Sequence, residues 1–396
     1  MPGSASVRPA PPAGPVVWNF PTRIVFGPGA LAQLADEARH LGARRALIVG
    51  DPGVVRAGLV ERATEALATG LISAEVFDGV GTNPTGAEAL AATEAYRAAG
   101  ANLVVALGGG AAIDVAKLVR ICATHAPPLA RYDAEAGGSA HLVEPFPPLI
   151  AIPTTAGTGS EVGRSAVATL AETGRKTIFF SPRLIPSVAL LDPELTLSLP
   201  ALQTAATGFD ALTHNIEALC TPMDHPMAEA IARMGIRLVA AHLERAVQES
   251  GNLGARAGMQ KAALCGGVAF QRGLGACHSL AHPLSTEFGL HHGLANALCL
   301  PAIADFNRHV VQRELAFVAE AFGARAGDEK SMAFECGGAL RALRRKVGLP
   351  DGMTAAGVTE DRLERLADLA YADPCHHENP RACTREDLLA LYRASM

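Results

Sequence analysis

Residues 103–117 have the sequence Leu103-Val-Val-Ala-Leu107-Gly108-Gly-Gly110-Ala-Ala-Ile-Asp114-Val-Ala-Lys117. The first five residues form a short apolar run, which is typical of a strand buried on both faces of a parallel sheet. Three glycines then lead into a helical segment, so backbone N–H groups and a helix N-terminus are left uncovered by side chains. Such a turn suits an anion such as a pyrophosphate. It does not match the GxGxxG fingerprint, and a tight packing turn is the alternative interpretation.

Similar apolar runs recur on both sides of this stretch. Strands are predicted from Trp18 to Phe26 and at 46–50, 74–77, 149–153 and 188–191, with helices at 30–41, 55–68 and 87–99. Strands that alternate with helices at this spacing predict an open parallel sheet, and ligands of such sheets bind at the carboxyl ends of the strands. We therefore predict an α/β fold that binds a dinucleotide in this half of the chain.

Polar residues that follow the predicted strands are candidates for contacts to the cofactor. Asp51 comes directly after the strand at 46–50, where a carboxylate accepts hydrogen bonds from ribose hydroxyls and repels the 2′-phosphate of NADP, which favours NAD. Asp is also common at the start of an Asp-Pro-Gly turn, which is the alternative role of Asp51. The loop at 154–161 adds hydroxyl donors. The predicted cofactor-binding residues are Asp51, Asn83, Gly108, Gly109, Gly110, Asp114, Thr154, Thr155, Thr158, Lys176 and Leu195.

A second motif lies far downstream and is rich in histidine. It reads His278-Ser-Leu-Ala-His282-Pro-Leu-Ser-Thr-Glu-Phe-Gly-Leu-His291-His292-Gly293. His278 and His282 are four residues apart and share one face of a helix. Pro283 and Gly289 argue against one unbroken helix, so we predict a helix end, a turn and a second pair of imidazoles brought back beside the first. Spacing alone does not separate His278 from His282, or His291 from His292.

A carboxylate and an imidazole stand four residues apart at Asp210 and His214. Together with two histidines of the later stretch they would give three nitrogens and one oxygen, a set that suits Fe2+ or Zn2+. Some of these histidines are instead core groups in the alternative interpretation. Cys375-His376-His377 with Cys383 is a further candidate for metal binding, but it has no companion motif.

The hydrophobic pattern of the chain changes near Leu199-Pro200, after which Ala- and Leu-rich segments with helical periodicity continue to the end. We therefore predict three segments: a disordered tail at 1–15, an α/β nicotinamide cofactor-binding domain at 16–199, and a helical metal-binding domain at 200–396. The tail is rich in Pro, Ala, Gly and Ser and lacks the apolar core of a signal peptide.

Composition restricts the partners. The 396 residues are 49% hydrophobic and 18% charged, with a net charge of −5. This balance favours neither nucleic acid nor an anionic membrane, and no apolar run approaches the ~18 residues that span a bilayer. The eight cysteines are scattered without a CxxC pair, which favours reduced thiols and a cytoplasmic protein.

Taken together, these stretches resemble the iron-containing (group III) alcohol dehydrogenases from Phe20 to the C-terminus. The likeness rests on Phe20-Pro-Thr-Arg-Ile-Val-Phe-Gly27 and the 108–117 loop, and on Ile152-Pro-Thr-Thr-Ala-Gly-Thr-Gly-Ser-Glu161, Asp192-Pro-Glu-Leu195, Gly208-Phe-Asp-Ala-Leu-Thr-His214 and the 278–296 block. The resemblance implies a dehydroquinate synthase-like fold, a homodimer or larger homo-oligomer, and a metal bound by Asp210, His214, His278 and His292. One departure is Ala111, where the family usually has Ser, which implies the loss of one hydroxyl contact to the cofactor.

The resemblance also implies the activity, a hydride transfer between NAD(H) and a small alcohol or aldehyde, with Fe2+ or Zn2+ as the metal and NADP less favoured. His282 is implied to lie beside the metal without binding it. It is our candidate for relaying the alcohol proton, with a structural role as the alternative. Gln271, Arg272 and Arg164 are candidates to favour a substrate with an anionic group. A lyase that uses NAD transiently and a binding protein without catalysis are the competing functions.

Overall fold

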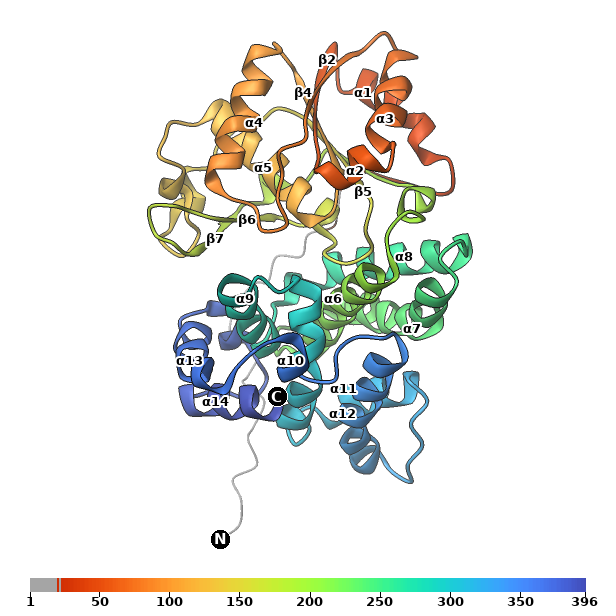
Figure 1. Ribbon diagram of the computed structural model, residues 1–396, viewed down its shortest axis with the longest axis vertical. Coiled ribbons are helices and arrows are strands. Elements are labelled where there is room, and N and C mark those ends of the chain that lie inside the picture. The colour runs from red at the N-terminus through yellow and green to blue at the C-terminus, as the bar shows by residue number, and fades with distance from the viewer. Residues whose placement is uncertain (1–19, 21–22) are drawn as a thin grey trace. The chain divides into compact units, whose positions relative to one another are not determined.

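A computed structural model describes Phe20 and residues 23–396. Its contacts divide the described chain into two compact units, Phe20–Leu199 and Pro200–Met396 (Figure 1). The predicted disordered tail at 1–15 lies outside the described residues, as does most of the first predicted strand before Arg23.

The first unit is built on a six-stranded parallel sheet with the order β1-β8-β5-β4-β2-β3. The strands are β1 (Arg23–Phe26), β2 (Arg45–Val49), β3 (Ser73–Phe77), β4 (Leu103–Gly108), β5 (Leu149–Pro153) and β8 (Val188–Leu191). The order places β4 in the interior of the sheet between β5 and β2, and all of its residues are buried. The predicted parallel α/β sheet is confirmed.

Helices cover both faces of this sheet (Figure 1). They are α1 (Leu34–His40), α2 (Pro52–Arg56), α3 (Leu59–Ala68), α4 (Gly86–Ala98) and α5 (Gly110–Thr124). The helix predicted at 55–68 is split in two, because Gly58 adopts a left-handed conformation with φ 70° and caps the start of α3. An antiparallel pair, β6 (Ser165–Thr169) and β7 (Lys176–Phe180), lies outside the main sheet.

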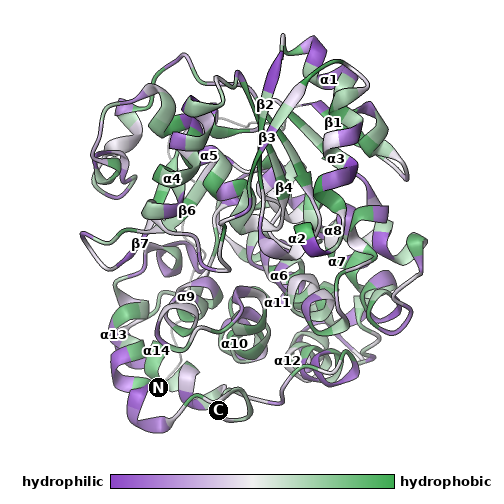
Figure 2. Cartoon of the chain, turned by 45° about the horizontal axis from the view of Figure 1, so that its top comes forward, coloured by the Kyte–Doolittle hydropathy of each residue, from purple (hydrophilic) through white to green (hydrophobic). Residues whose placement is uncertain are grey.

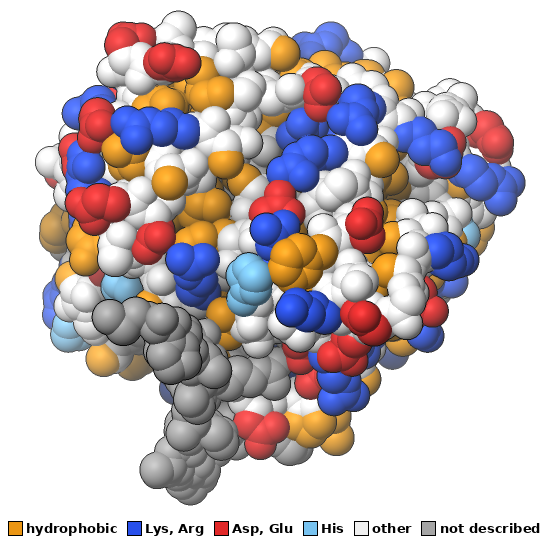
Figure 3. Space-filling view, turned by 90° about the horizontal axis from the view of Figure 1, so that it is seen from below, with side chains coloured by type: hydrophobic (Ala, Val, Ile, Leu, Met, Phe, Trp, Pro, Cys, Tyr) orange, Lys and Arg blue, Asp and Glu red, His pale blue; other side chains and the backbone are white. Residues whose placement is uncertain are grey.

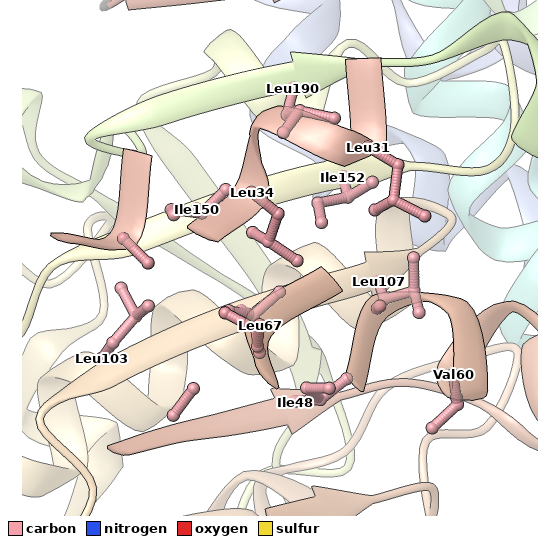
Figure 4. Packing of buried hydrophobic residues seen from close by; sticks show 14 of the residues in the cluster. Leu31, Leu34, Ile48, Val60, Leu67, Leu103, Leu107, Ile150, Ile152 and Leu190 are labelled. Atoms are coloured by element: carbon pink, nitrogen blue, oxygen red, sulfur yellow. The ribbon is translucent and has the colours of Figure 1, made fainter. Parts of the chain in front are cut away.

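Side-chain alternation along the strands sends neighbouring residues into two cores. Val105 and Ile150 belong to the core that packs against α1 and α3, as Figure 4 shows for Ile150 with Leu34 and Leu67. Val104 belongs to the core that packs against α5. Figure 2 shows the matching hydropathy, with mainly hydrophobic residues along the central strands. Because both faces are buried, the strands read as continuous apolar runs in the sequence.

In the second unit, all regular elements described between 200 and 396 are helical, which confirms the predicted helical region. Its α-helices are α6 (Ala201–Cys220), α7 (Pro226–Gln248), α8 (Leu253–Ala269), α9 (Ala276–Phe288), α10 (His292–Asn307), α11 (Gln312–Ala321), α12 (Glu329–Lys346), α13 (Leu363–Tyr371) and α14 (Arg385–Ala394). Pro283 is accommodated inside α9, which ends at Gly289 with φ 65°. The predicted turn before the second pair of histidines is therefore confirmed.

None of the described helices is both long enough and apolar enough to cross a bilayer. On the face drawn in Figure 3, basic and acidic side chains are interspersed over the surface.

Buried charges fasten α5 to the loop that follows β5. Lys117 is fully buried, and its Nζ donates to the carbonyl oxygens of Ser160 and Ser165 at 2.8 and 2.7 Å and to the Ser160 hydroxyl at 2.9 Å. Burial lowers the pKa of Lys117 to about 8, against the opposing effect of Asp114 and Glu161. Asp114 accepts hydrogen bonds from the Ser160 hydroxyl and the Val167 amide. This network sets the position of the loop at 158–163 relative to α5.

Replacing Lys117 by Ala removes the central donor of this network and leaves buried acceptors and carboxylates without their cation. We expect Lys117→Ala to lower the free energy of unfolding by about 3–5 kcal/mol, the usual cost of breaking a buried ionic contact on one side. Denaturant unfolding measures it. The exposed Lys330→Ala is the matched control and should stay within about 0.5 kcal/mol of wild type. A loss below about 1 kcal/mol for Lys117→Ala would contradict this role.

Candidate functional site

The carboxyl ends of β2, β4 and β5 bring several predicted cofactor-binding residues together. Gly108 ends β4 with φ 157°, and a Cβ placed on it would lie 3.2 Å from Oδ2 of Asp51. A Cβ on Gly110 would lie 2.5 Å from Cγ2 of Thr158. The glycine turn thus sits between Asp51 and the threonine loop, and larger residues would not fit there. Both the predicted packing role and an anion cradle are compatible with this geometry.

The N-terminus of α5 is the part of the turn that suits a phosphate. Its N-cap residue, Gly109, provides no side-chain hydrogen bond to the first turn. The first N–H groups of a helix have no partners within the helix, and the helix dipole favours negative charge there. The start of α5 could therefore hold a pyrophosphate.

Asp51 caps α2 with one carboxylate oxygen and places the other beside the glycine turn. Its Oδ1 accepts hydrogen bonds from the amides of Gly53 at 2.7 Å and Val54 at 3.2 Å, so it caps α2 as the Asp-Pro-Gly turn predicts. Its Oδ2 is on the side of Gly108. One oxygen thus holds the turn while the other lies beside the glycines, where the ribose of a bound dinucleotide was expected.

The other predicted cofactor residues have different surroundings. Asn83 is exposed in the loop before α4, and Thr154 is buried with its amide donating to Gly108 at 3.0 Å. Lys176 begins β7 close enough to Asp114 to affect its ionisation. Leu195 is 1% exposed and packs in the core. The structure therefore gathers Asp51, the three glycines, Thr155 and Thr158, whereas Asp114 is engaged with Ser160 and Val167.

In the helical unit, three helices bring together the predicted metal ligands. Asp210 and His214 come from α6, His278 from α9 and His292 from the first position of α10. One potential ligand atom from each of Asp210, His214 and His278 lies within 4.8 Å of the other two. His292 Nε2 lies 3.5 Å from Asp210 Oδ1, and its ring centroid lies 5.4 Å from that of His278. These four side chains form one cluster, in which the carboxylate is central.

His278 shows that the cluster fits a metal ion. Its Nδ1 forms a 2.5 Å hydrogen bond with Oε2 of Glu217, and its buried Nε2 has no hydrogen-bond partner among the described residues. A carboxylate can only accept, so Nδ1 carries the proton and Nε2 keeps a lone pair for a metal. Burial alone would lower the pKa of His278, but the neighbouring carboxylates, with Glu217 the strongest, raise it. The same negative charges would stabilise a divalent cation.

The structure also separates the histidines that spacing left ambiguous. His291 Nδ1 accepts a hydrogen bond from the Gly293 amide at 3.2 Å and so caps α10. His282 Nδ1 is hydrogen-bonded to Oδ2 of Asp373 at 2.7 Å. Its ring centroid lies 5.3 Å from that of His292, so it borders the cluster.

Three residues of this site were missed by the sequence analysis. Glu217 follows Asp210 by seven residues on the same face of α6, and Asn296 follows His292 by four on α10, so helical spacing was a usable signal for both. Asn296 Nδ2 donates to Asp210 Oδ1 at 2.9 Å. Asp373 is 91 residues from His282, and no local pattern connects them. Burial alone would raise the pKa of Asp373, but His282 and further hydrogen-bond donors hold it well below its usual value.

A parallel sheet with a glycine turn at its carboxyl edge, followed by a helical unit that clusters histidines around a carboxylate, is typical of metal-dependent dehydrogenases. Comparison with known proteins agrees. The family model "Iron-containing alcohol dehydrogenase" matches residues 21–193, and the model of the family's C-terminal region matches residues 204–396. This chain belongs to the iron-containing alcohol dehydrogenase family, and it is an oxidoreductase.

Individual relatives resemble the chain over nearly its whole length. A 4-hydroxybutyrate dehydrogenase from Cupriavidus necator is 41% identical over 95% of this chain and 98% of that protein. The crystal structure of a 1,3-propanediol oxidoreductase has a TM-score of 0.92 and 34% identity, over 96% of this chain and all of that one. A sulfoacetaldehyde reductase from Bifidobacterium kashiwanohense, in complex with NAD+, has a TM-score of 0.83 and 31% identity, over 96% and 99% of the two chains.

Metal content tests the ligand set directly. We expect His278→Ala to lose its metal on dialysis, and Glu217→Gln to weaken metal affinity by about 10–100-fold, because Glu217 orients the ligand without binding the ion. Elemental analysis of the dialysed proteins measures both. His291→Ala is the control and should keep its metal, since its imidazole caps a helix. Loss of metal from His291→Ala but not from His278→Ala would reverse the assignment.

Proposed function

We propose that this chain is an NAD-dependent alcohol dehydrogenase, or aldehyde reductase, whose Fe2+ or Zn2+ is held by Asp210, His214, His278 and His292. The observation that carries the proposal is the buried Nε2 of His278, which faces the cluster while Glu217 holds the other ring nitrogen. We further propose that it acts in the cytoplasm as a homodimer or larger homo-oligomer. The family resemblance supports the assembly, and the scattered cysteines support the compartment.

The metal, when bound, supplies a Lewis acid that polarises a substrate carbonyl or stabilises an alkoxide. The chain's residues then have distinct tasks. Glu217 fixes the ring of His278, and Asn296 holds an oxygen of Asp210 by donating to it. Asp51 and the glycine turn would bind the ribose and the pyrophosphate of NAD. NAD, when bound, would supply the hydride acceptor or donor, and these residues would act by positioning it.

His282 is the proposed proton relay. Because the Asp373 carboxylate accepts a hydrogen bond, it keeps a proton on Nδ1, and Nε2 is then the nitrogen that exchanges a proton with the substrate oxygen. The ionised carboxylate also stabilises the imidazolium that forms when Nε2 takes up a proton.

For the substrate, we propose a short aldehyde or alcohol with an anionic group at its far end. The named activities of the 4-hydroxybutyrate dehydrogenase and the sulfoacetaldehyde reductase support this class. Arg272 is a weaker candidate for binding the anion than the sequence suggested. It is buried and donates to the carbonyls of Thr221 and Met223. Arg164, another candidate for binding the anion, has its guanidinium 5.1 Å from the centre of the Phe180 ring.

A comparison of three alcohols tests this class. We expect 4-hydroxybutyrate to give NADH with a kcat/KM about 10–100-fold above that of 1-butanol, because one charge-assisted contact to the carboxylate contributes roughly 1.5–3 kcal/mol. 1,3-Propanediol, which has a polar but neutral far end, should lie between them. Equal kcat/KM values would contradict the anionic substrate while leaving the dehydrogenase in place. No NADH from any alcohol by the metal-loaded protein would contradict both.

Cofactor choice tests Asp51. Two unit charges about 4 Å apart cost roughly 1 kcal/mol in water and roughly 4 kcal/mol at an effective dielectric of 20, so Asp51 should favour NADH over NADPH by about 5- to 1000-fold. We expect Asp51→Asn to lose most of this preference, measured as the ratio of kcat/KM values. Asn keeps the cap on α2, so stability should change little, whereas Asp51→Gly removes both cap and charge. A wild type that prefers NADPH would show that Asp51 does not face the ribose.

A further inference from the structure

His282, Asp373 and Cys375 form a second group of metal-binding atoms in the helical unit, and it shares no ligand with the Asp210 cluster. One potential ligand atom from each lies within 4.8 Å of the other two. His282 comes from α9, whereas Asp373 precedes and Cys375 lies within the short 3-10 helix η10 (Pro374–Glu378). All three side chains are partly buried, so they are shielded from bulk water but within reach of an ion.

The group is held in place by its own hydrogen bonds. Asp373 Oδ1 accepts from the Cys375 amide at 2.9 Å, which fixes the two side chains on one turn. The Ser279 hydroxyl, one helical turn before His282, donates to the same oxygen at 2.8 Å. That hydroxyl also accepts from the His376 amide at 2.8 Å. The turn at 373–376 is thereby attached to the helix that carries His282, and little further ordering is needed to bind an ion.

The donor types select the ion. An imidazole nitrogen, a carboxylate oxygen and a thiolate sulfur suit Zn2+ or Co2+, whereas Mg2+ and Ca2+ prefer oxygen alone. Three protein ligands with a water in the fourth position is a usual arrangement for zinc. Bond lengths of about 2.0–2.3 Å place tetrahedral donors roughly 3.5 Å apart. His282 Nδ1 and Asp373 Oδ2, which are 2.7 Å apart, therefore have to separate slightly, while Cys375, whose Sγ lies within 4.8 Å of a ligand atom of each, moves closer.

We propose that His282, Asp373 and Cys375 bind a second, inhibitory Zn2+ ion. Bonds form from zinc to Nδ1 of His282, to Oδ2 of Asp373 and to Sγ of Cys375. The hydrogen bond between His282 and Asp373 breaks, the imidazole proton moves from Nδ1 to Nε2 by exchange with solvent, and the thiol proton leaves to solvent. No electrons are transferred. The ion, one carboxylate and one thiolate sum to zero charge, so the occupied site is neutral, one positive charge above the empty site with its ionised Asp373.

Inhibition follows from the tautomer, and this part rests on the proposed function. With zinc on Nδ1 and the proton on Nε2, His282 has no lone pair with which to accept the alcohol proton. The ion also binds the Asp373 carboxylate, which then no longer stabilises the His282 imidazolium. Zinc in excess of the catalytic metal should therefore lower turnover without displacing that metal.

Cobalt binding tests the site independently of activity. The Asp210 cluster contains no sulfur, so a thiolate-to-Co2+ charge-transfer absorption reports only a cysteine-containing site. We expect this band, with the release of one proton per ion, when Co2+ is added to enzyme that already holds one zinc per chain. Cys375→Ser should abolish the band. Cys383→Ser, the matched control on another partly buried cysteine, should keep it. No band in the wild type, or a band that survives Cys375→Ser, overturns the proposal.

Two further measurements secure the interpretation. In the wild type, Zn2+ should protect Cys375 from alkylation, as peptide mass spectrometry detects, and this needs no variant to fold. In turnover assays, excess Zn2+ should inhibit the wild type and Cys383→Ser at concentrations at least about 10-fold lower than Cys375→Ser, the smaller end of the effect of losing a metal contact. If the cobalt band forms but no dehydrogenase activity exists, the second site stands and the proposed function fails. If activity exists without the band or the protection, the second site fails alone.

Discussion

The proposed chemistry of the helical unit depends on the hydrogen bond between His278 and Glu217. Glu217 and Asp210 are 4% and 2% exposed, and burying two carboxylates is costly unless cations or donors compensate them. Glu217 accepts hydrogen bonds from the His278 imidazole and the Cys277 amide, and Asp210 accepts one from the side-chain amide of Asn296. A divalent ion bound by Asp210 and the histidines, as proposed, would add further compensation, so the proposed metal and the packing of these helices would support each other.

The α/β unit meets a different constraint, which is steric. At the carboxyl edge of the sheet, the glycine turn passes so close to Asp51 and Thr158 that side chains at Gly108 and Gly110 would collide with their neighbours. The buried network of Lys117 and Ser160 holds the threonine loop in that position. The same closeness that demands glycine leaves the backbone amides at the start of α5 uncovered by side chains. One geometry therefore supports both the packing role and the proposed ligand binding, which is why sequence reasoning could not choose between them.

How far the sequence predicts this structure depends on the range of each interaction. The strands and the helical half were predictable because hydrophobic periodicity is local, and the turn before His292 because Gly289 favours a left-handed conformation. The break between α2 and α3 was missed because one glycine inside a helical pattern is ambiguous. In the metal cluster, the spacing of Asp210 and His214 was informative, and Glu217 on the same helical face could have been added. Asp373 could not, because its approach to α9 depends on the packing of segments 91 residues apart.

The histidines between 278 and 292 differ in the atom that faces Nδ1, and this partner determines which ring nitrogen carries the proton. A carboxylate faces Nδ1 in His278 and His282, so the proton resides there and Nε2 is the nitrogen left for the proposed metal binding or proton relay. In His291 a backbone N–H faces Nδ1, which must then be the unprotonated nitrogen, and the ring serves as a helix cap. What separates His278 from His282 is burial. His278 is buried among carboxylates that favour a bound cation, whereas His282 is partly exposed, which allows it to exchange a proton. Sequence spacing predicts neither the partner of Nδ1 nor the burial of the ring, because each depends on residues of another turn or helix.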